Sequence, residues 1–132
     1  MPAGLASRDT LRLQAGMPLY GHELTTEISP LHARLEWTSP SDKEADYVGR
    51  AALEAFAVNG TDSVLVGLAG HGRVARAGCR VRDKDGTVIG EVTSGVLSPT
   101  LGHPIALAYL PPTYDAEGSE VLALMSVAKC CR

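Results

Sequence analysis

The sequence predicts an α+β fold that is mostly β, with a short helical and extended N-terminal segment followed by a small antiparallel (Greek-key) β-barrel. From residue 63 onward, short apolar stretches recur with turn signals between them, which is typical of antiparallel sandwiches and barrels. A chain of 132 residues suits one domain, or one small domain with an appendage. The residues are 45% hydrophobic but only 5% aromatic, so the core must be built from Val, Leu, Ile and Ala.

Two helices are predicted ahead of the β-rich part. Residues 4–14 can form the first, because Leu11 and Ala15 stack at i,i+4, and Gly16 then ends it. The second helix covers Tyr47–Phe56, whose alanines supply a packing face.

One strand is predicted between the helices and five after them. A turn at Ser29-Pro30 precedes an apolar and polar alternation over Leu31–Trp37, which predicts a short strand. The five later strands are Val64–Leu68, Gly78–Arg82, Thr87–Ser94, Ile105–Leu110 and Glu120–Leu124.

A hairpin with unusual glycines lies in the middle of the β-rich part. Asp83–Gly86 can make a tight turn because its Asp-Gly step tolerates a positive φ, so the flanking strands are expected to pair. Gly90 and Gly95 follow at positions where side chains are expected. They predict a bulge, a sharp bend or a close backbone approach.

Charge and hydropathy exclude several function classes. A net charge of −3 gives no basic footprint for nucleic acid. There is neither a long apolar run nor a basic and apolar leader, so no membrane association is expected and the cytoplasm is the default location. Cys79, Cys130 and Cys131 lack CxxC spacing and are expected to be structural thiols. The four histidines are scattered without HxxxH spacing, which gives no support to a metal site.

Residue chemistry alone leaves two interpretations of Arg8 and Arg12 open. Guanidinium groups bind carboxylates in a bidentate manner, so the pair could clamp a carboxylate ligand. A surface helix with paired charges is the simpler explanation of the same residues. The glycine-rich stretch Gly67–Gly72 lacks the Lys-Ser/Thr step that a phosphate-binding P-loop requires.

Several stretches nevertheless follow one another in the order of a known family. From Pro2 to about Leu124, the chain closely resembles the glycine cleavage T-protein (aminomethyltransferase) family. The stretches that carry the resemblance are Gly4–Leu13, Ala15–Leu24, Ile28–Leu31, Tyr47–Arg50, Arg76–Gly78, Gly90–Gly95, Ser98–Gly102 and Ile105–Tyr109.

The resemblance implies a folate-dependent transferase. Such an enzyme releases ammonia from an aminomethyl group on the lipoyl arm of the H protein and makes methylenetetrahydrofolate. Only the last third of the family is matched, so residues 1–58 correspond to the tail end of the folate-binding domain and residues 59–132 to the C-terminal β-barrel domain. The catalytic aspartate of the family belongs to the unmatched part, and this chain alone is expected to show no turnover.

The same resemblance implies three ligand-binding residues and no catalytic one. Arg8 matches the arginine that meets the carboxylate tail of tetrahydrofolate, which suits a bidentate guanidinium. Met17 and Trp37 match positions near the pterin or its linker.

The C-terminal residues depart from the family. Members continue past Leu124 with a strand of the type Val-Arg-Gly-Lys, whereas this chain reads on through Met125–Arg132. One choice of codons, shifted by one base, restores a peptide close to the family strand, so we hypothesise a frameshift. Loss of the last barrel strand would expose an edge, and self-association into a homo-oligomer could cover it.

Two other interpretations stay open. The chain could be the C-terminal part of a folate-dependent dehydrogenase or demethylase of the same superfamily. It could also be a stand-alone, non-catalytic module that self-associates.

Overall fold

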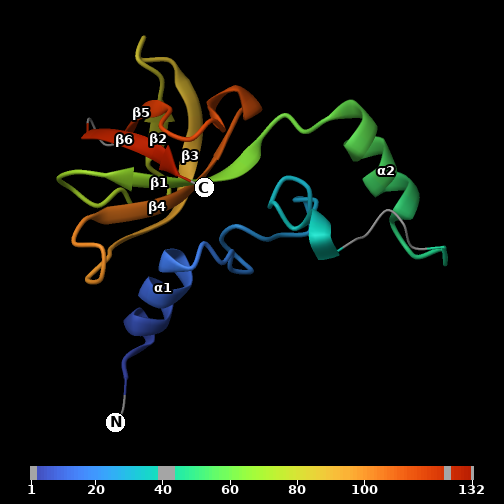
Figure 1. Cartoon of the computed structure of the whole chain (residues 1–132), viewed down its shortest axis with the longest axis horizontal. Coiled ribbons are helices and arrows are strands. Elements are labelled where there is room, and N and C mark those ends of the chain that lie inside the picture. Colours follow the sequence, from blue (N-terminus) through green and yellow to red (C-terminus); the bar gives the residue numbers. More distant parts are fainter. Residues whose placement is uncertain (1–2, 39–43, 124–125, 132) are drawn as a thin grey trace.

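The chain folds into a closed barrel of antiparallel strands preceded by an N-terminal arm, residues 3–38 and 44–63 (Figure 1). The computed structural model describes residues 3–38, 44–123 and 126–131. The arm carries helix α1 (Leu5–Gln14), the 3₁₀ turn η1 (Glu36–Thr38) and helix α2 (Arg50–Asn59). The barrel is built from β1 (Val64–Gly70), β2 (Arg80–Arg82), β3 (Val88–Leu97), β4 (Pro104–Leu110), β5 (Glu120–Ala123) and β6 (Ser126–Cys131), with η2 (Pro112–Tyr114) after β4.

The strand order confirms the predicted Greek-key barrel. Strands β2, β3 and β4 form a meander, and β1 pairs with β4 rather than with β2, which is the Greek-key arrangement. The order β1-β4-β3-β2-β5-β6 then closes, because β6 pairs back onto β1. All five strands predicted in the β-rich part are present, with ends that differ by a few residues.

The hairpin of β2 and β3 forms as its turn residues predict. The N–H of Asp83 donates to Thr87 O at 3.0 Å, and Gly86 has a φ of +86°. The Asp83 carboxylate also accepts the N–H groups of Asp85 and Thr87, at 2.9 and 2.8 Å. The carboxylate therefore holds the turn closed from inside.

Both barrel glycines mark close backbone approaches, and a bulge lies between them. A Cβ on Gly90 would overlap the carbonyl oxygen of Tyr109, and one on Gly95 would overlap that of Ala75. The pairing of β3 with β4 shifts by one residue at Thr93. This bulge lies directly before Ser94, which pairs with Leu107 and is buried beneath α1, where its hydroxyl contacts Arg12.

The barrel interior is filled by small aliphatic side chains, as the composition predicts. Val81, Val92, Ala108, Leu110 and Val121 are all at most 1% exposed. A second, smaller cluster of Leu13, Leu65 and Leu107 packs α1 onto the outside of β1 and β4. The first helix is therefore part of the barrel's packing.

The strand predicted over Leu31–Trp37 is wrong. Residues 30–34 form a helical turn, in which Leu35 N–H donates to Pro30 O at 2.8 Å, and η1 follows. Proline is favoured in the first turn of a helix, where its missing N–H costs nothing, so Pro30 starts a turn instead of a strand. The turn packs against β1, since Leu65 N–H donates to His32 O at 2.8 Å.

The prediction that the last barrel strand is missing is also wrong. Residues Ser126–Cys131 form β6, which pairs with β5 and with Gly67–Gly70 of β1. Ala128 and Cys130 are two positions apart and buried, as the period of a strand requires. Burial raises the pKa of the Cys130 thiol to about 11, which suits a structural thiol.

Closure by β6 removes the edge on which the expected homo-oligomer depended. Among the described strands, each one has a neighbour on both sides. Leu124, Met125 and Arg132, which belong to the predicted strand end and tail, lie outside the described residues.

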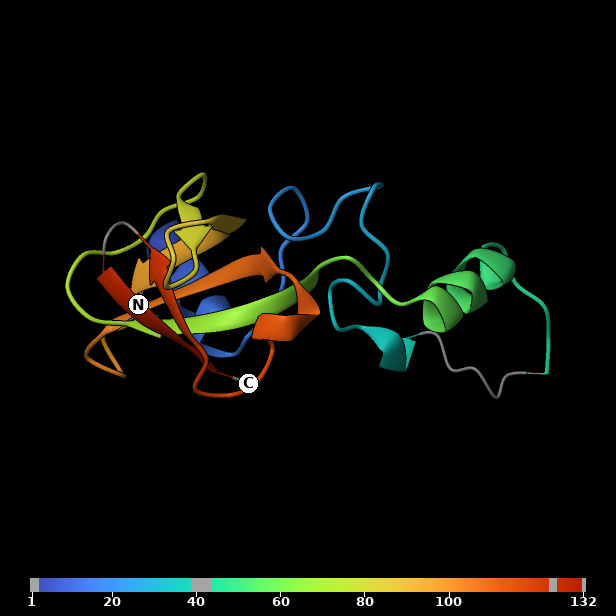
Figure 2. The same cartoon turned by 90° about the horizontal axis from the view of Figure 1, so that it is seen from above.

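Helix α2 projects away from the barrel at the far end of the arm (Figure 2). It begins at Arg50 rather than at the predicted Tyr47, because Gly49 adopts a φ of +91° just before it. Neither described helix is long and apolar enough to cross a membrane.

Candidate functional site

Helix α1 is fastened to the barrel by the guanidinium of Arg12, which is 9% exposed. Its Nη2 donates to Ser94 Oγ on β3 at 2.7 Å, and its Nη1 donates to Glu23 Oε2 at 2.8 Å. Its Nε donates to Asp9 Oδ1 at 2.8 Å. Because the guanidinium is engaged on three sides, Arg12 joins the helix, the loop that follows it and the barrel.

A tight connection brings Glu23 beneath the helix. Gly16, with a φ of +66°, ends α1 in a Schellman motif, and the N–H of Met17 donates to Arg12 O at 2.8 Å. The chain then turns back so that Leu19 N–H donates to Glu23 Oε2 at 2.9 Å. Glu23 is fully buried, and its side chain meets the helix on one side and the barrel on the other.

The surroundings of Glu23 keep its carboxyl ionised. Burial alone would raise its pKa, but the side chains of Ser94 and Thr93, the Leu19 N–H and the charge of Arg12 outweigh burial and hold the pKa below its ordinary value. The hydroxyl of Tyr109 donates to the backbone oxygen of Glu23 at 2.8 Å. Burial and the Glu23 charge raise the pKa of Tyr109 to about 12, so this hydroxyl remains a donor at neutral pH.

A second contact fixes the C-terminal end of α1. Gln14 Nε2 donates to Ser98 Oγ at 2.6 Å, just beyond the end of β3. Ser98 is fully buried, and its Oγ also accepts the N–H of Leu101 at 3.0 Å. The helix is thus anchored to β3 near both of its buried residues, and it cannot tilt without breaking one of these contacts.

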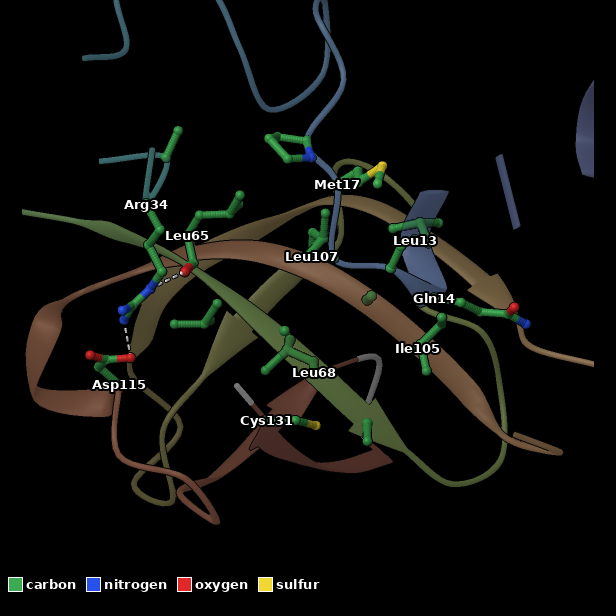
Figure 3. Close-up of a pocket in the computed structure, with 18 of the residues that line it drawn as sticks. Leu13, Gln14, Met17, Arg34, Leu65, Leu68, Ile105, Leu107, Asp115 and Cys131 are labelled. Carbon is green, nitrogen blue, oxygen red and sulfur yellow. Dashed lines mark hydrogen bonds and ion pairs between the residues drawn. The ribbon is translucent and has the colours of Figure 1, made fainter. Parts of the chain in front are cut away.

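A large groove runs between the arm and the outer face of β1 and β4, with a volume of about 800 Å³. Figure 3 shows Leu13, Leu65 and Leu107 forming its apolar floor, with Gln14 at one end and Arg34 at the other. Arg34 Nε donates to Leu65 O at 2.8 Å, and its guanidinium pairs with Asp115. The groove is therefore apolar along its length, with an ion pair at one end.

A smaller hollow of about 320 Å³ opens on another face of α1. Its polar lining is formed by Arg8, Asp9, Arg12 and His22. Arg8 is exposed one helical turn before Arg12, and no hydrogen bond or ion pair joins it to another described residue. The hollow thus presents one exposed cation above a buried ion pair.

The three predicted ligand-binding residues fall into two separate cavities. Met17 and Trp37 line the groove and are 59% and 78% exposed. Arg8 lines the hollow instead. Helix α1 separates the two cavities, since its residues 8, 9 and 12 line one of them and residues 13 and 14 line the other.

Sequence reasoning missed the buried cluster of Arg12, Glu23 and Ser94. It treated Arg8 and Arg12 as equivalent surface cations, although only Arg8 is exposed. Two features of the sequence distinguish Arg12 from Arg8. Asp9 lies three residues before Arg12, and Glu23 follows in the turn that contains Gly21. Neither signal identifies Ser94, which lies 82 residues away in the sequence.

The barrel matches a family model. Residues 64–128 match the model described as "Glycine cleavage T-protein C-terminal barrel domain". This range runs from the start of β1 into β6.

Curated relatives match both the arm and the barrel. The chain is 60% identical to an aminomethyltransferase of Cutibacterium acnes over 121 residues, which is 91% of this chain and 32% of the relative. It is 54% identical to an aminomethyltransferase of Streptomyces coelicolor over 124 residues, which is 91% of this chain and 33% of that relative. The chain therefore spans about a third of the length of these relatives.

A solved structure has the same fold. The crystal structure of glycine cleavage system aminomethyltransferase T from Bartonella henselae matches 98% of this chain and 38% of its own, with a TM-score of 0.90 and 34% identity. The match therefore includes the arm and helix α2 as well as the barrel. The chain belongs to the glycine cleavage T-protein family, and it corresponds to the C-terminal portion of that family.

Proposed function

We propose that this chain is the C-terminal part of a tetrahydrofolate-dependent aminomethyltransferase. In that reaction the aminomethyl group carried by the lipoyl H protein yields ammonia, and its methylene group passes to tetrahydrofolate. The observation that carries the proposal is the match of 91% of the chain, arm and barrel together, to an aminomethyltransferase at 60% identity. Within the enzyme, residues 1–58 would belong to the folate-binding domain and residues 59–132 would form the barrel domain.

Arg8 is the residue best suited to hold the folate. Its guanidinium is exposed, and it is bound to no other described side chain, so both of its outer nitrogens can meet a carboxylate. Arg12 cannot share this role, because Glu23, Asp9 and Ser94 already occupy its donors. The carboxylate tail of tetrahydrofolate would lie in the hollow beside Arg8.

Met17 and Trp37 would contact the other end of the folate. Both are exposed and line the groove, where an aromatic and a thioether can cover a flat ring. Because α1 separates the groove from the hollow, the ligand would pass over the helix between them. The described residues place no acid or base in the groove apart from His103, the Cys131 thiol and the ion pair of Arg34 with Asp115. We therefore propose no catalytic residue in this chain.

Calorimetric titration with tetrahydrofolate tests the ligand site. We expect measurable heat with the unaltered chain and a loss of affinity of roughly tenfold or more in Arg8→Ala, because a charge-assisted hydrogen bond is removed. Lys84→Ala is the matched control, since Lys84 is another exposed cation but lies on the β2 to β3 turn. Equal affinity in Arg8→Ala, or no heat with the unaltered chain, would contradict the proposed site.

The chain alone is expected to release no ammonia from an aminomethyl-loaded H protein. A steady release that scales with the concentration of the chain would show that it holds a complete catalytic site. That result would overturn the proposal that it is one part of the enzyme.

A further inference from the structure

The side chain of His22 lines the same hollow as Arg8. Its ring is exposed, and Nδ1 lies 3.4 Å from two oxygens of β3, the backbone oxygen of Thr93 and the Oγ of Ser94. Because a backbone oxygen can only accept, the contact with Thr93 places the proton of the neutral ring on Nδ1. No hydrogen bond or ion pair joins Nε2 to another described residue. The ring is therefore held by one nitrogen and has the other available to a ligand.

The other polar side chains around His22 leave two groups that can bind an anion. The Asp9 carboxylate and the Arg12 guanidinium are paired with each other, and Arg12 also pairs with the buried Glu23. Arg8 is exposed and is bound to no other described side chain. The hollow therefore has one permanent free cation, Arg8, and one ring nitrogen that becomes a donor only when His22 is protonated.

Among the side chains that line the hollow, only His22 is of a type whose charge ordinarily changes between pH 5 and pH 8. Guanidinium groups and carboxylates ordinarily keep their charge in this range. Beneath the hollow, the pKa of Glu23 is lowered despite its burial, and burial raises the pKa of Tyr109, whose hydroxyl meets the Glu23 backbone, to about 12. A ligand that needs a positive charge on His22 must therefore bind more tightly as the pH falls.

The glutamate tail of tetrahydrofolate has the chemistry that these two groups recognise, because it carries two carboxylates. The hollow has a volume of about 320 Å³, near the lower end of small-molecule sites, so it suits a tail rather than a whole folate. Arg8 can bind one carboxylate in a bidentate manner, and a protonated His22 can donate from Nε2 to the other. A carboxylate at this distance favours the charged ring, so binding draws a proton onto it.

We propose that His22 is a second anchor for the folate tail, so that Arg8 and a protonated His22 hold its two carboxylates. The proton comes from the solvent and stays on the ring while the ligand is bound. Affinity for the tail therefore rises as the pH falls from 8 to 6. This inference rests on the proposed function, because it takes the ligand from there.

An NMR chemical-shift titration of the full chain with p-aminobenzoylglutamate, which is the tail of folate without its pterin, tests the proposal. We expect a dissociation constant that is lower at pH 6 than at pH 8 by roughly threefold or more, the scale of an ion pair at a protein surface. His22→Gln should remove this pH dependence, and because His22 is exposed, the change leaves the buried Arg12 cluster in place. His71→Gln is the matched control, since His71 is also exposed but follows β1 and lies outside the hollow.

A second probe, p-aminohippurate, separates the two anchors, because it carries the same ring with a single carboxylate. Arg8 alone would hold it, so its affinity should be the same at both pH values and the same in His22→Gln. A dissociation constant for p-aminobenzoylglutamate that does not change with pH, or a pH dependence that persists in His22→Gln, would overturn the proposal. The absence of binding of this probe at both pH values would overturn it as well.

Tetrahydrofolate itself separates this inference from the proposed function. Binding that Arg8→Ala weakens, but that is equally tight at pH 6 and pH 8, would leave the proposed function standing and remove His22 as an anchor. A site for p-aminobenzoylglutamate that depends on pH through His22, in a chain that does not bind tetrahydrofolate, would do the reverse.

Discussion

Arg12 shows how one side chain can tie three parts of the chain together. Its guanidinium is buried with a carboxylate that is itself fully buried, at 2.8 Å. Placing two charges inside a protein costs desolvation energy, which their attraction and additional hydrogen bonds must offset. Here Ser94, Asp9 and the Leu19 N–H supply those hydrogen bonds. Removing one partner therefore costs more than the pair contributes.

We predict that Glu23→Gln destabilises the fold by about 3 to 5 kcal/mol, because the Arg12 charge is left buried without its counter-charge. The variant should also change the dependence of stability on pH. The folded-state pKa of Glu23 is lowered, so its contribution is present above its ordinary value of about 4.5 and is lost as the pH falls through the folded pKa. Guanidinium chloride unfolding between pH 3 and pH 7 measures both effects.

Glu54→Gln is the control for this prediction. Glu54 also pairs with an arginine, Arg50 at 2.8 Å, but its side chain is 60% exposed. A surface pair contributes less than about 1 kcal/mol, so the free energy of unfolding should barely change. Similar losses of unfolding free energy in Glu23→Gln and Glu54→Gln would show that burial does not increase the cost of breaking the Arg12 pair.

At the scale of elements, short-range chemistry was predictable and long-range pairing was not. The β2 to β3 hairpin follows from its own turn residues, and it forms as predicted. The strand expected over Leu31–Trp37 failed because Pro30, one residue upstream, favours a helical turn.

The sixth strand was missed for a different reason. Residues 126–131 depart from the Val-Arg-Gly-Lys type of strand that family members carry there, and their pairing with β1 joins positions about 60 residues apart. Likewise, the link from Arg12 to Ser94 depends on where the barrel places β3. Local sequence carries no signal for such contacts, because they join residues that only the folded barrel brings together.

The glycines of β3 give a prediction at this scale. Gly95→Ala should destabilise the fold by about 1 to 3 kcal/mol, because the added Cβ overlaps the backbone oxygen of Ala75 and neither group can move freely. Equilibrium unfolding in guanidinium chloride measures the change.

Gly4→Ala is the matched control, since φ is −74° there and an added Cβ meets nothing within 4 Å. The loss there should stay below about 1 kcal/mol, as expected at a helix N-cap. An unchanged free energy of unfolding in Gly95→Ala would show that the connection holding Ala75 can move away from β3 at no cost.

At the scale of the whole molecule, the closed barrel and the N-terminal arm differ in how much of their apolar surface is buried. The barrel satisfies its own strand edges through β6 and buries an aliphatic core. The arm is anchored by α1, whereas its far helix has no buried residue and contacts the His32 ring through Phe56. Stability is therefore concentrated in the barrel and α1, whereas the surface suited to interaction lies on the arm and in the groove.

The stability of the barrel depends on its closure by β6. A chain without residues 126–132 would leave Gly67–Gly70 of β1 and all of β5 with one unpaired edge each, and it would uncover Leu68 and Val121, which pair with Cys130 and Ala128. Open edges beside exposed apolar residues recruit strands from other copies. We therefore predict that the shortened chain self-associates into species larger than the full chain at the same concentration, as measured by light scattering after size exclusion.

Cys131→Ser is the control, because it keeps the strand while changing one partly exposed thiol, and it should behave like the unaltered chain. If the shortened chain kept the molar mass and unfolding midpoint of the full chain, β6 would not be needed for closure, and the barrel would have to be stable with an open seam.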